Sequence, residues 1–326
     1  MKPAPNAKAL ALALSAYATP VGGELSGAAR FRLGLQRQLE DMNLLRDGAA
    51  WGYHFDAQTR HLFYARDTPN AIATCFVVEA LCDSFGAWGE TTHRELALRA
   101  RPFLLSLLAD APGHGPFFAY VASGSELIHN ANVLVCGTLA RLHALEPDPE
   151  AEHAAREAVA TTLALQRADG LWPYGEADNL RWADNFHTAY ILDGLARMRS
   201  EFGIAGDALD RCLRAWRESF FEPDGWARYV ADHRFPLEAH SCASAIDLLG
   251  RLAAEDPGHE DWEELIAMAS RIADSAIREL WISERSRFAF RRTARGLNKR
   301  EFMRWTNAPM FRALARLCAA METNAP

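Results

Sequence analysis

The chain lacks most of the short motifs that identify common catalytic and cofactor sites. Its 326 residues contain no GxGxxG, GxxxxGK[ST], HExxH or GxSxG segment, which excludes the dinucleotide, phosphate-loop, metalloprotease and serine-hydrolase sites that these motifs define. The DxDD motif of alkene-protonating terpenoid cyclases is missing as well. The six cysteines form no CxxC pair, so we expect buried free thiols in a reducing compartment. The sequence therefore predicts no cofactor and no metal.

Lysine is scarce, and acidic residues outnumber basic ones. The formal net charge is −7, and only Lys2, Lys8 and Lys299 among the 35 lysine and arginine residues are lysines. No block of like charge occurs, and because nucleic acids bind to basic surfaces, a nucleic-acid partner is excluded. No run approaches the ~20 apolar residues of a membrane helix, which predicts no membrane span.

The N-terminal stretch has the appearance of a short signal peptide, because Lys2 and Lys8 precede ALALALSAYA, which ends in small residues. Its apolar core is short for such a sequence. We therefore expect a cytoplasmic protein, with a periplasmic location as the alternative, and we assign residues 1–23 to an N-terminal extension.

Five segments share one layout, in which an aromatic pair precedes a polar residue and then a helix with apolar residues at helical spacing. The polar residues are Asn70, Asn130, Asn185, His240 and Asn307, which stand 55 to 67 positions apart. That period fits a helical hairpin with a long loop. The repeat segments run from Trp51 to Leu81, Phe118 to Leu142, Trp172 to Met198, Trp226 to Leu252 and Phe288 to Leu317. The second helix of each hairpin is predicted at 25–45, 92–108, 149–166, 207–220 and 261–281.

Helical hairpins that repeat around an axis bury a common core. The predicted fold is therefore all-α, an α/α toroid of about five hairpins with six as the alternative, in a single domain spanning 1–326. If the repeat helices form the inner ring, their N-termini and the aromatic loops lie at one end. Helix N-termini carry partial positive charge and free N–H groups, so this mouth suits a polar or anionic ligand.

The chemically active residues concentrate in the third segment, where Tyr174 and Glu176 are followed by Asp184 and His187. Glu238 precedes the fourth repeat helix, and Arg304 precedes the fifth. These six are the candidate catalytic residues. Substrate binding is assigned to the polar and aromatic residues around the helix starts, namely Asn70, His129, Asn130, Asn185, His240, Trp51, Trp172 and Trp305.

A structural interpretation stays open beside each of these roles. Asparagine and aspartate are favoured helix N-caps, and tryptophans such as Trp51 and Trp172 can fill gaps between hairpins. Histidine is an indifferent cap, so three histidines at helix starts favour a catalytic role for at least one. A buried Arg304 needs an anionic partner, which is Glu238, Glu176 or a ligand.

The segments DGLWPYGEADNLRWADNFHTAYILDGL and HNANVLVCGTLARL resemble helical-toroid proteins found with bacterial exopolysaccharide biosynthesis genes, and the resemblance runs from Trp51 to Leu317. The architecture also resembles the six-hairpin glycosidases, polysaccharide lyases and sugar 2-epimerases, within a wider α/α-toroid group that includes prenyltransferases.

The resemblance implies a carbohydrate-active enzyme and leaves three functions open. The first is lyase- or epimerase-type proton abstraction from an acidic or uronate-containing glycan, with His187 or Tyr174 as base and Arg304 near the carboxylate. The second is glycoside hydrolysis by Asp184 with Glu176 or Glu238. The third is a non-catalytic glycan-binding or isoprenoid-handling toroid. The expected partner is a glycan or another small polar substrate.

Overall fold

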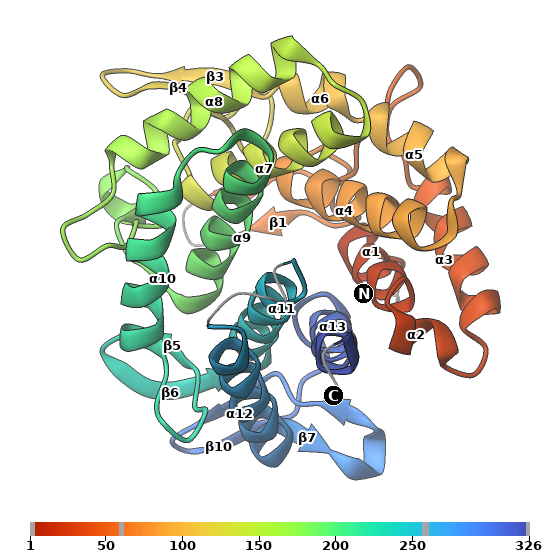
Figure 1. The fold of residues 1–326 in the computed structure, drawn as a ribbon, viewed down its shortest axis with the longest axis vertical. Coiled ribbons are helices and arrows are strands. Elements are labelled where there is room, and N and C mark those ends of the chain that lie inside the picture. Colours follow the sequence, from red (N-terminus) through yellow and green to blue (C-terminus); the bar gives the residue numbers. More distant parts are fainter. Residues whose placement is uncertain (1–3, 59–61, 256–260, 324–326) are drawn as a thin grey trace.

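The computed structural model, which describes residues 4–58, 62–255 and 261–323, is a ring of helices inside a second ring (Figure 1). The inner helices are α1 (Ala7–Tyr17), α4 (Ala71–Trp88), α7 (His129–Leu145), α9 (Asn185–Phe202), α11 (Ala239–Glu255) and α13 (Ala308–Thr323). The outer helices are α2 (Pro20–Glu24), α3 (Ala28–Asp41), α5 (Thr91–Leu98), α6 (Arg101–Leu105), α8 (Pro149–Ala164), α10 (Gly206–Phe220) and α12 (Trp262–Leu280). The predicted all-α toroid is confirmed, and the number of inner helices is six among the described residues.

The assignment of residues 1–23 to an extension is wrong, because α1 belongs to the inner ring. This helix packs between α4 and α13, and its Leu12 and Leu14 are fully buried. The Asn6 side chain caps it by accepting a hydrogen bond from the Ala9 N–H at 3.1 Å. A helix buried on nearly all sides shows little amphipathic contrast, which is why its alanines and leucines looked like a signal peptide.

Helix α4 requires a second correction. It is long and apolar enough to cross a membrane by length and composition, contrary to the expectation that no run has that property. In the structure 67% of this stretch is buried, since α4 packs against α1, α5 and α7. Its apolar surface is thus covered by the protein itself.

Other departures from the predicted helices have local causes. The helix expected at 92–108 is divided into α5 and α6, and Pro102 stands in the first turn of α6, where a missing N–H is tolerated. Helix α6 ends at Leu105, and the chain then forms β3 (Leu108–Ala111), which pairs with β4 (Gly115–Phe118).

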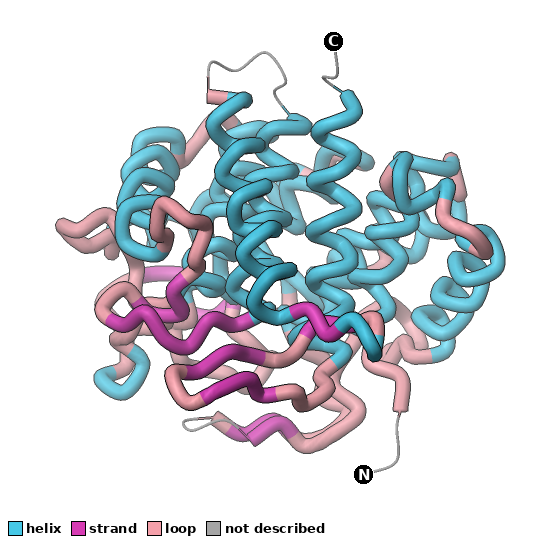
Figure 2. The backbone as a smooth tube through the Cα atoms, turned by 90° about the horizontal axis from the view of Figure 1, so that it is seen from below, coloured by secondary structure: helices cyan, strands magenta, loops and turns pink. Residues whose placement is uncertain are grey.

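Short strands gather with the loops at one end of the molecule, whereas the helices extend toward the other (Figure 2). A four-stranded antiparallel sheet, in the order β10-β9-β6-β5, was not expected from the sequence. It consists of β5 (Arg228–Val230), β6 (His233–Glu238), β9 (Arg291–Thr293) and β10 (Gly296–Asn298), and two hairpins add β1 (Ala57–Gln58) with β2 (Phe63–Tyr64) and β7 (Trp281–Ile282) with β8 (Arg287–Phe288). Pairing β6 with β9 joins segments more than 50 residues apart, which local alternation does not reveal.

Two glycines let α7 and α9 pack closely. A Cβ atom added at Gly137 would lie 2.8 Å from the Gly194 Cα, and one added at Gly194 would lie 2.4 Å from the carbonyl oxygen of Val133. These contacts are shorter than van der Waals separations. The spacing of the two inner helices therefore depends on the absence of side chains there.

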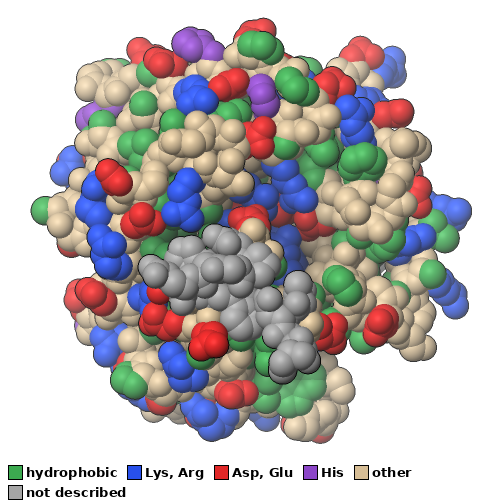
Figure 3. All heavy atoms as spheres, in the orientation of Figure 1, with side chains coloured by type: hydrophobic (Ala, Val, Ile, Leu, Met, Phe, Trp, Pro, Cys, Tyr) green, Lys and Arg blue, Asp and Glu red, His purple; other side chains and the backbone are tan. Residues whose placement is uncertain are grey.

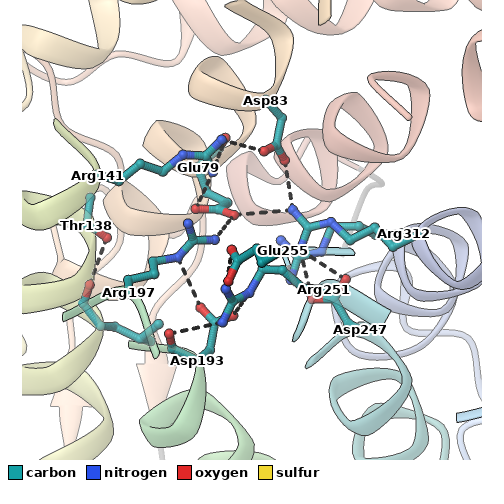
Figure 4. Close-up of polar contacts among 12 residues, drawn as sticks. Glu79, Asp83, Thr138, Arg141, Asp193, Arg197, Asp247, Arg251, Glu255 and Arg312 are labelled. Carbon is teal, nitrogen blue, oxygen red and sulfur yellow. Dashed lines mark hydrogen bonds and ion pairs between the residues drawn. The ribbon is translucent and has the colours of Figure 1, made fainter. Parts of the chain in front are cut away.

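Arginines and carboxylates from the middle and the later turns of the inner helices meet near the axis of the ring (Figure 4). Glu79 of α4 pairs with Arg141 of α7 at 2.7 Å, with Arg197 of α9, and with Arg316 of α13 at 3.2 Å. Burial alone would raise the pKa of Glu79, but the three guanidinium groups hold it well below its usual range.

The other acids of this cluster lie on α4, α9 and α11. Asp83 pairs with Arg141 and Arg316, Asp193 with Arg251 at 2.6 Å, and Asp247 with Arg316 at 3.3 Å. Side chains of both charges gather around the hollowed middle of this face of the molecule (Figure 3). Each inner helix from α4 to α13 is thereby linked to at least one other by an ion pair.

We expect Gly194→Ala to lower the free energy of unfolding by about 1–3 kcal/mol, because the methyl group would force α7 and α9 apart. Gly86→Ala in α4 is the matched control, since a Cβ atom there meets nothing within 4 Å, and we expect it to stabilise the helix by roughly 0.5–1 kcal/mol. Urea unfolding followed by circular dichroism measures both. Equal effects of the two substitutions would contradict close packing at Gly194.

Glu79→Gln removes the shared acid and leaves three buried guanidinium groups undercompensated, so we expect a loss of about 3–5 kcal/mol in unfolding free energy at neutral pH. The exposed Glu95→Gln is the control and is expected to stay within about 0.5 kcal/mol of the wild type. The advantage of the wild type over Glu79→Gln should shrink as the pH falls below about 4.3, where the unfolded chain takes up protons. A pH-independent difference would contradict a lowered pKa at Glu79.

Candidate active site

A cavity of about 690 Å³ lies where the inner helices begin and the aromatic loops meet. Each of the six inner helices contributes to its wall, α13 through the turn Met303–Asn307 that precedes it. The predicted mouth is thus present. Its polar and aromatic lining consists of Lys8, Tyr53, Tyr64, Tyr120, Asn130, Tyr174, Trp182, Phe186, His187, Tyr190, Tyr229, Glu238, His240, Phe290, Arg304 and Trp305.

Asp184 and His187 form a hydrogen-bonded pair at the first turn of α9. Asp184 is the N-cap of that helix, and its Oδ1 accepts the backbone N–H of His187 at 2.9 Å. Its Oδ2 lies 2.8 Å from His187 Nδ1, and the Tyr229 hydroxyl also hydrogen-bonds to this carboxylate. The capping geometry orients the imidazole and leaves its Nε2 for the cavity. Asp184 itself is fully buried and does not line the cavity.

His240 is held by hydrogen bonds at both ring nitrogens. Its Nε2 lies 2.9 Å from the Tyr190 hydroxyl, and its Nδ1 lies 3.2 Å from the carbonyl oxygen of Trp305. The Lys8 ammonium nitrogen contacts the same Tyr190 hydroxyl at 3.1 Å. Burial first, and then the charges of Lys8 and His187, lower the pKa of His240 well below its usual range. A neutral His240 with both nitrogens engaged supports the wall of the cavity and is a poor base.

Glu238 is the carboxylate at the cavity. It stands at the end of β6, opposite Arg291 of β9 in the sheet register, and Arg291 Nη1 lies 3.3 Å from its Oε1. Burial raises the pKa of Glu238 to about 7, against the opposing effect of Arg291. A carboxyl group with this pKa can donate or accept a proton near neutral pH.

Arg304 faces the cavity over aromatic rings. Its guanidinium carbon lies 4.6 Å from the ring centroid of Tyr53, 5.0 Å from Phe55 and 4.6 Å from Trp305. The expected protein partners are engaged elsewhere, since Glu238 pairs with Arg291 and Glu176 with His129. No described carboxylate forms an ion pair with Arg304, so the expectation that Glu238 or Glu176 compensates its charge is wrong.

Tyrosines form one wall of the cavity. The hydroxyls of Tyr53 and Tyr120 are 2.6 Å apart, and the ring of Tyr64 stacks on that of Tyr120 at a centroid distance of 4.5 Å. Tyr174, a predicted catalytic residue, stacks on Trp182 at 4.6 Å. Burial raises the pKa of Tyr174 above its usual range, which makes it a poor base at neutral pH.

Two of the predicted substrate-binding tryptophans lie in the core. Trp51 is fully buried and donates its indole N–H to the carbonyl oxygen of Leu39 at 2.8 Å, and Trp172 donates to that of Thr162 at 2.7 Å. Trp305, in contrast, lines the cavity and is 41% exposed. The prediction therefore fails for Trp51 and Trp172 because their hydrogen bonds and burial are those of gap-filling side chains.

Two predicted polar residues, Asn70 and Asn185, serve the helix starts instead of the cavity. Asn70 caps α4 by accepting the Ala73 N–H at 2.9 Å. Asn185 is fully buried, where it accepts from the Trp216 indole at 3.0 Å and donates to the carbonyl of Arg228. These side chains are satisfied within the protein and do not line the cavity, whereas Asn130 does, and its buried Oδ1 has no partner.

His129 and Glu176 form an ion-pair contact of 2.9 Å outside the cavity. His129 is fully buried, and its other nitrogen lies 3.1 Å from the Thr162 hydroxyl. The hydrogen bond from His129 lowers the pKa of Glu176. Both were predicted as site residues, and both instead connect α7 and α8 to the loop before α9.

Sequence reasoning missed several residues of the site. Lys8 was excluded with the assumed extension, and Tyr190, which lies one helical turn after His187, was not singled out. The repeats themselves distinguish the aromatic residues that line the cavity. In each repeat the first aromatic residue is buried and a later one lines the cavity, as Trp51 and Tyr53 do in the first repeat and Trp172 and Tyr174 in the third.

No family model matches the sequence, and no curated protein matches it. Solved structures of similar fold include an α-mannanase of family GH76 from Bacteroides thetaiotaomicron, with 13% identity, a TM-score of 0.69 and coverage of 98% of this chain and 86% of that one. A cellobiose 2-epimerase from Spirochaeta thermophila has 11% identity, a TM-score of 0.71 and coverage of 98% and 87%. An α-1,6-mannanase from a Salegentibacter species has 13% identity, a TM-score of 0.65 and coverage of 98% and 90%. The chain therefore shares the α/α-toroid fold of these mannanases and of this epimerase.

The raised pKa of Glu238 predicts an unusual pH dependence of stability. Between about 4.3, the carboxyl pKa in an unfolded chain, and about 7, the folded protein keeps a proton that the unfolded chain has lost. Stability from this group is therefore lost as the pH rises through that window, by up to about 4 kcal/mol. We expect the unfolding free energy of the wild type, relative to that of Glu238→Gln, to be lower at the upper end of this pH window than at its lower end. Parallel pH profiles for the two proteins would contradict the raised pKa.

Proposed function

We propose that the protein is a carbohydrate-active enzyme that abstracts a proton from an acidic, uronate-type sugar, with His187 as the base. The observation that carries this proposal is the hydrogen bond between Asp184 and His187 Nδ1, which leaves His187 Nε2 for the cavity. A carboxylate that orients an imidazole in this way selects the tautomer whose free nitrogen accepts a proton.

Aromatic residues support a sugar as the substrate. Tyr64, Tyr174, Trp182 and Trp305 line the cavity, and flat aromatic faces suit the apolar faces of sugar rings. The similar solved structures are named as mannanases and a cellobiose 2-epimerase, which are proteins that act on saccharides. An acidic sugar is supported by Arg304, because it faces the cavity with no carboxylate partner in the described chain.

The reaction begins with Arg304 binding the uronate carboxylate and lowering the energy of the carbanion that forms beside it. His187 Nε2 takes the proton from the adjacent carbon, and Asp184 stabilises the resulting imidazolium through Nδ1. Glu238, which is protonated in a substantial fraction of molecules near pH 7, then supplies a proton. Delivered to the carbanion carbon it completes an epimerisation, and delivered to a leaving oxygen it completes an elimination.

Glycoside hydrolysis is the second candidate, and the arrangement of carboxylates disfavours it. Hydrolysis by acid and base carboxylates needs two such groups on either side of the bond. Glu238 is the one carboxylate of the described chain that lines the cavity, since Asp184 and Glu176 are turned to histidines. An inactive variant of the Salegentibacter mannanase carries alanine at two adjacent aspartates, and the present sequence has no two adjacent aspartates.

Incubation with uronate oligosaccharides in D₂O tests proton abstraction. We expect deuterium to enter the carbon next to the carboxylate, as measured by mass spectrometry and NMR, and elimination would add absorbance near 235 nm. His187→Asn and Asp184→Asn should each lower the exchange rate about 10²–10⁴-fold.

His233→Asn, at an exposed histidine of β6 outside the cavity, is the matched control and should keep the wild-type rate. New reducing ends without deuterium incorporation would support hydrolysis instead. Binding of the oligosaccharides with neither change would indicate a non-catalytic glycan-binding protein.

A further inference from the structure

Lys8 brings an amine from the first helix of the chain into the cavity wall. Its side chain is buried, with only 5% of the residue exposed, and its Nζ lies 4.1 Å from the ring centroid of Phe76. The hydrogen bond to the Tyr190 hydroxyl, at 3.1 Å, is its one described polar contact. The proposed proton transfer by His187 uses neither Lys8 nor Tyr190.

No anionic side chain in the described chain pairs with the Lys8 amine. It forms no ion pair with a described carboxylate, and the charged groups that act on it most strongly are Arg304 and Arg312, both positive. Burial, and then these two arginines, lower the pKa of Lys8 well below its usual range. Arg312 is paired with Asp247 at 2.5 Å, whereas Arg304 has no such partner. Lys8 and Arg304 therefore leave the cavity short of negative charge.

The carboxylate at the cavity does not make up this shortage. Glu238 contacts Arg291, and its pKa near 7 leaves it protonated in a substantial fraction of molecules at neutral pH. The cavity wall thus presents two basic side chains, Lys8 and Arg304, and at most one anion, which is already engaged by Arg291. A buried ammonium without an anion is costly, and the cost is removed when an anionic ligand arrives or when the amine releases its proton.

We propose that Lys8 is an anion-binding residue, which contacts a carboxylate of the acidic ligand in the cavity and binds a proton more tightly once that ligand is in place. In the free protein the amine is held by Tyr190 and Phe76. The arriving carboxylate supplies the missing counter-charge and raises the pKa of Lys8 toward its usual value, so a proton passes from solvent to Lys8 Nζ at pH values between the pKa of the free protein and that of the complex. The proposal rests on the proposed function only in taking an acidic sugar as the ligand, and it concerns binding without turnover.

The scarcity of lysine makes a direct test possible. Neutral amines are methylated by formaldehyde and cyanoborohydride, and mass spectrometry separates the products at Lys8 from those at Lys299, whose side chain is 54% exposed. We expect D-glucuronate to slow methylation of Lys8 about tenfold at ten times its dissociation constant, with no effect on Lys299. D-Glucose, which has the same ring and no carboxylate, should not protect Lys8. An unchanged rate at Lys8 in about 100 mM glucuronate, or equal protection by glucose, overturns the proposal.

Calorimetry with D-glucuronate at several pH values from about 6 to 10, each in two buffers of different ionisation enthalpy, provides the second readout. The wild type should take up protons on binding over part of this range, whereas Lys8→Arg should bind without uptake at every pH, because guanidinium is already charged. Lys8→Met should lose the uptake and bind at least about tenfold more weakly. Uptake that persists in Lys8→Met overturns the proposal. Thermal unfolding of both variants checks that α1 remains in the ring.

Failure of this inference is distinguishable from failure of the proposed function. Methylation and proton uptake are measured at equilibrium, and both can be repeated in His187→Asn. Protection of Lys8 without deuterium exchange into uronates would refute only the proton abstraction. Deuterium exchange without protection of Lys8 would refute only its role as an anion-binding residue.

Discussion

Ion pairs along the axis hold the inner helices in one orientation, and the position of the cavity depends on that orientation. Glu79 alone joins α4 to α7, α9 and α13, and Asp193 joins α9 to α11 through Arg251. Parallel helices bring their negative C-terminal dipole ends together, which is unfavourable without nearby positive charge. The guanidinium groups in the C-terminal halves of α7, α9, α11 and α13 supply that charge. The opposite ends, rich in N–H groups, are then left to face a ligand.

At those opposite ends, capping and chemistry use the same residues. Asp184 is an N-cap whose second oxygen orients His187, so the start of α9 and the candidate base are set by one side chain. Elsewhere the cap stays purely structural, as at Asn70. The difference lies in the residue three positions on, which is histidine in α9 and alanine in α4. The start of α9 thereby carries a candidate base, whereas the cap at the start of α4 has a structural role.

The sequence predicted the toroid and the end at which the cavity lies, because both follow from the spacing of the repeats. Within the cavity, His187, His240, Glu238, Arg304, Tyr174, Asn130 and Trp305 were predicted and are present in the wall. Trp51 and His129 were assigned wrongly, since whether a side chain faces the ring interior or a neighbouring hairpin depends on loop paths that local pattern does not contain. The pairing of β6 with β9, which places Arg291 beside Glu238, is likewise a long-range contact. Lys8 was not predicted as a site residue because a buried apolar helix and a secretory signal peptide have similar compositions.

The contact between α1 and α13 joins a helix that is synthesised early to one that is synthesised late. Ribosomes release α1 before α13, so the face of α1 that packs on α13 stays uncovered until α13 has been made. Contacts between segments so far apart in the sequence carry a large loop-closure entropy and form late. Before α13 docks, the cavity is open on one side, and no ligand can be enclosed between Lys8, Tyr190 and Arg304.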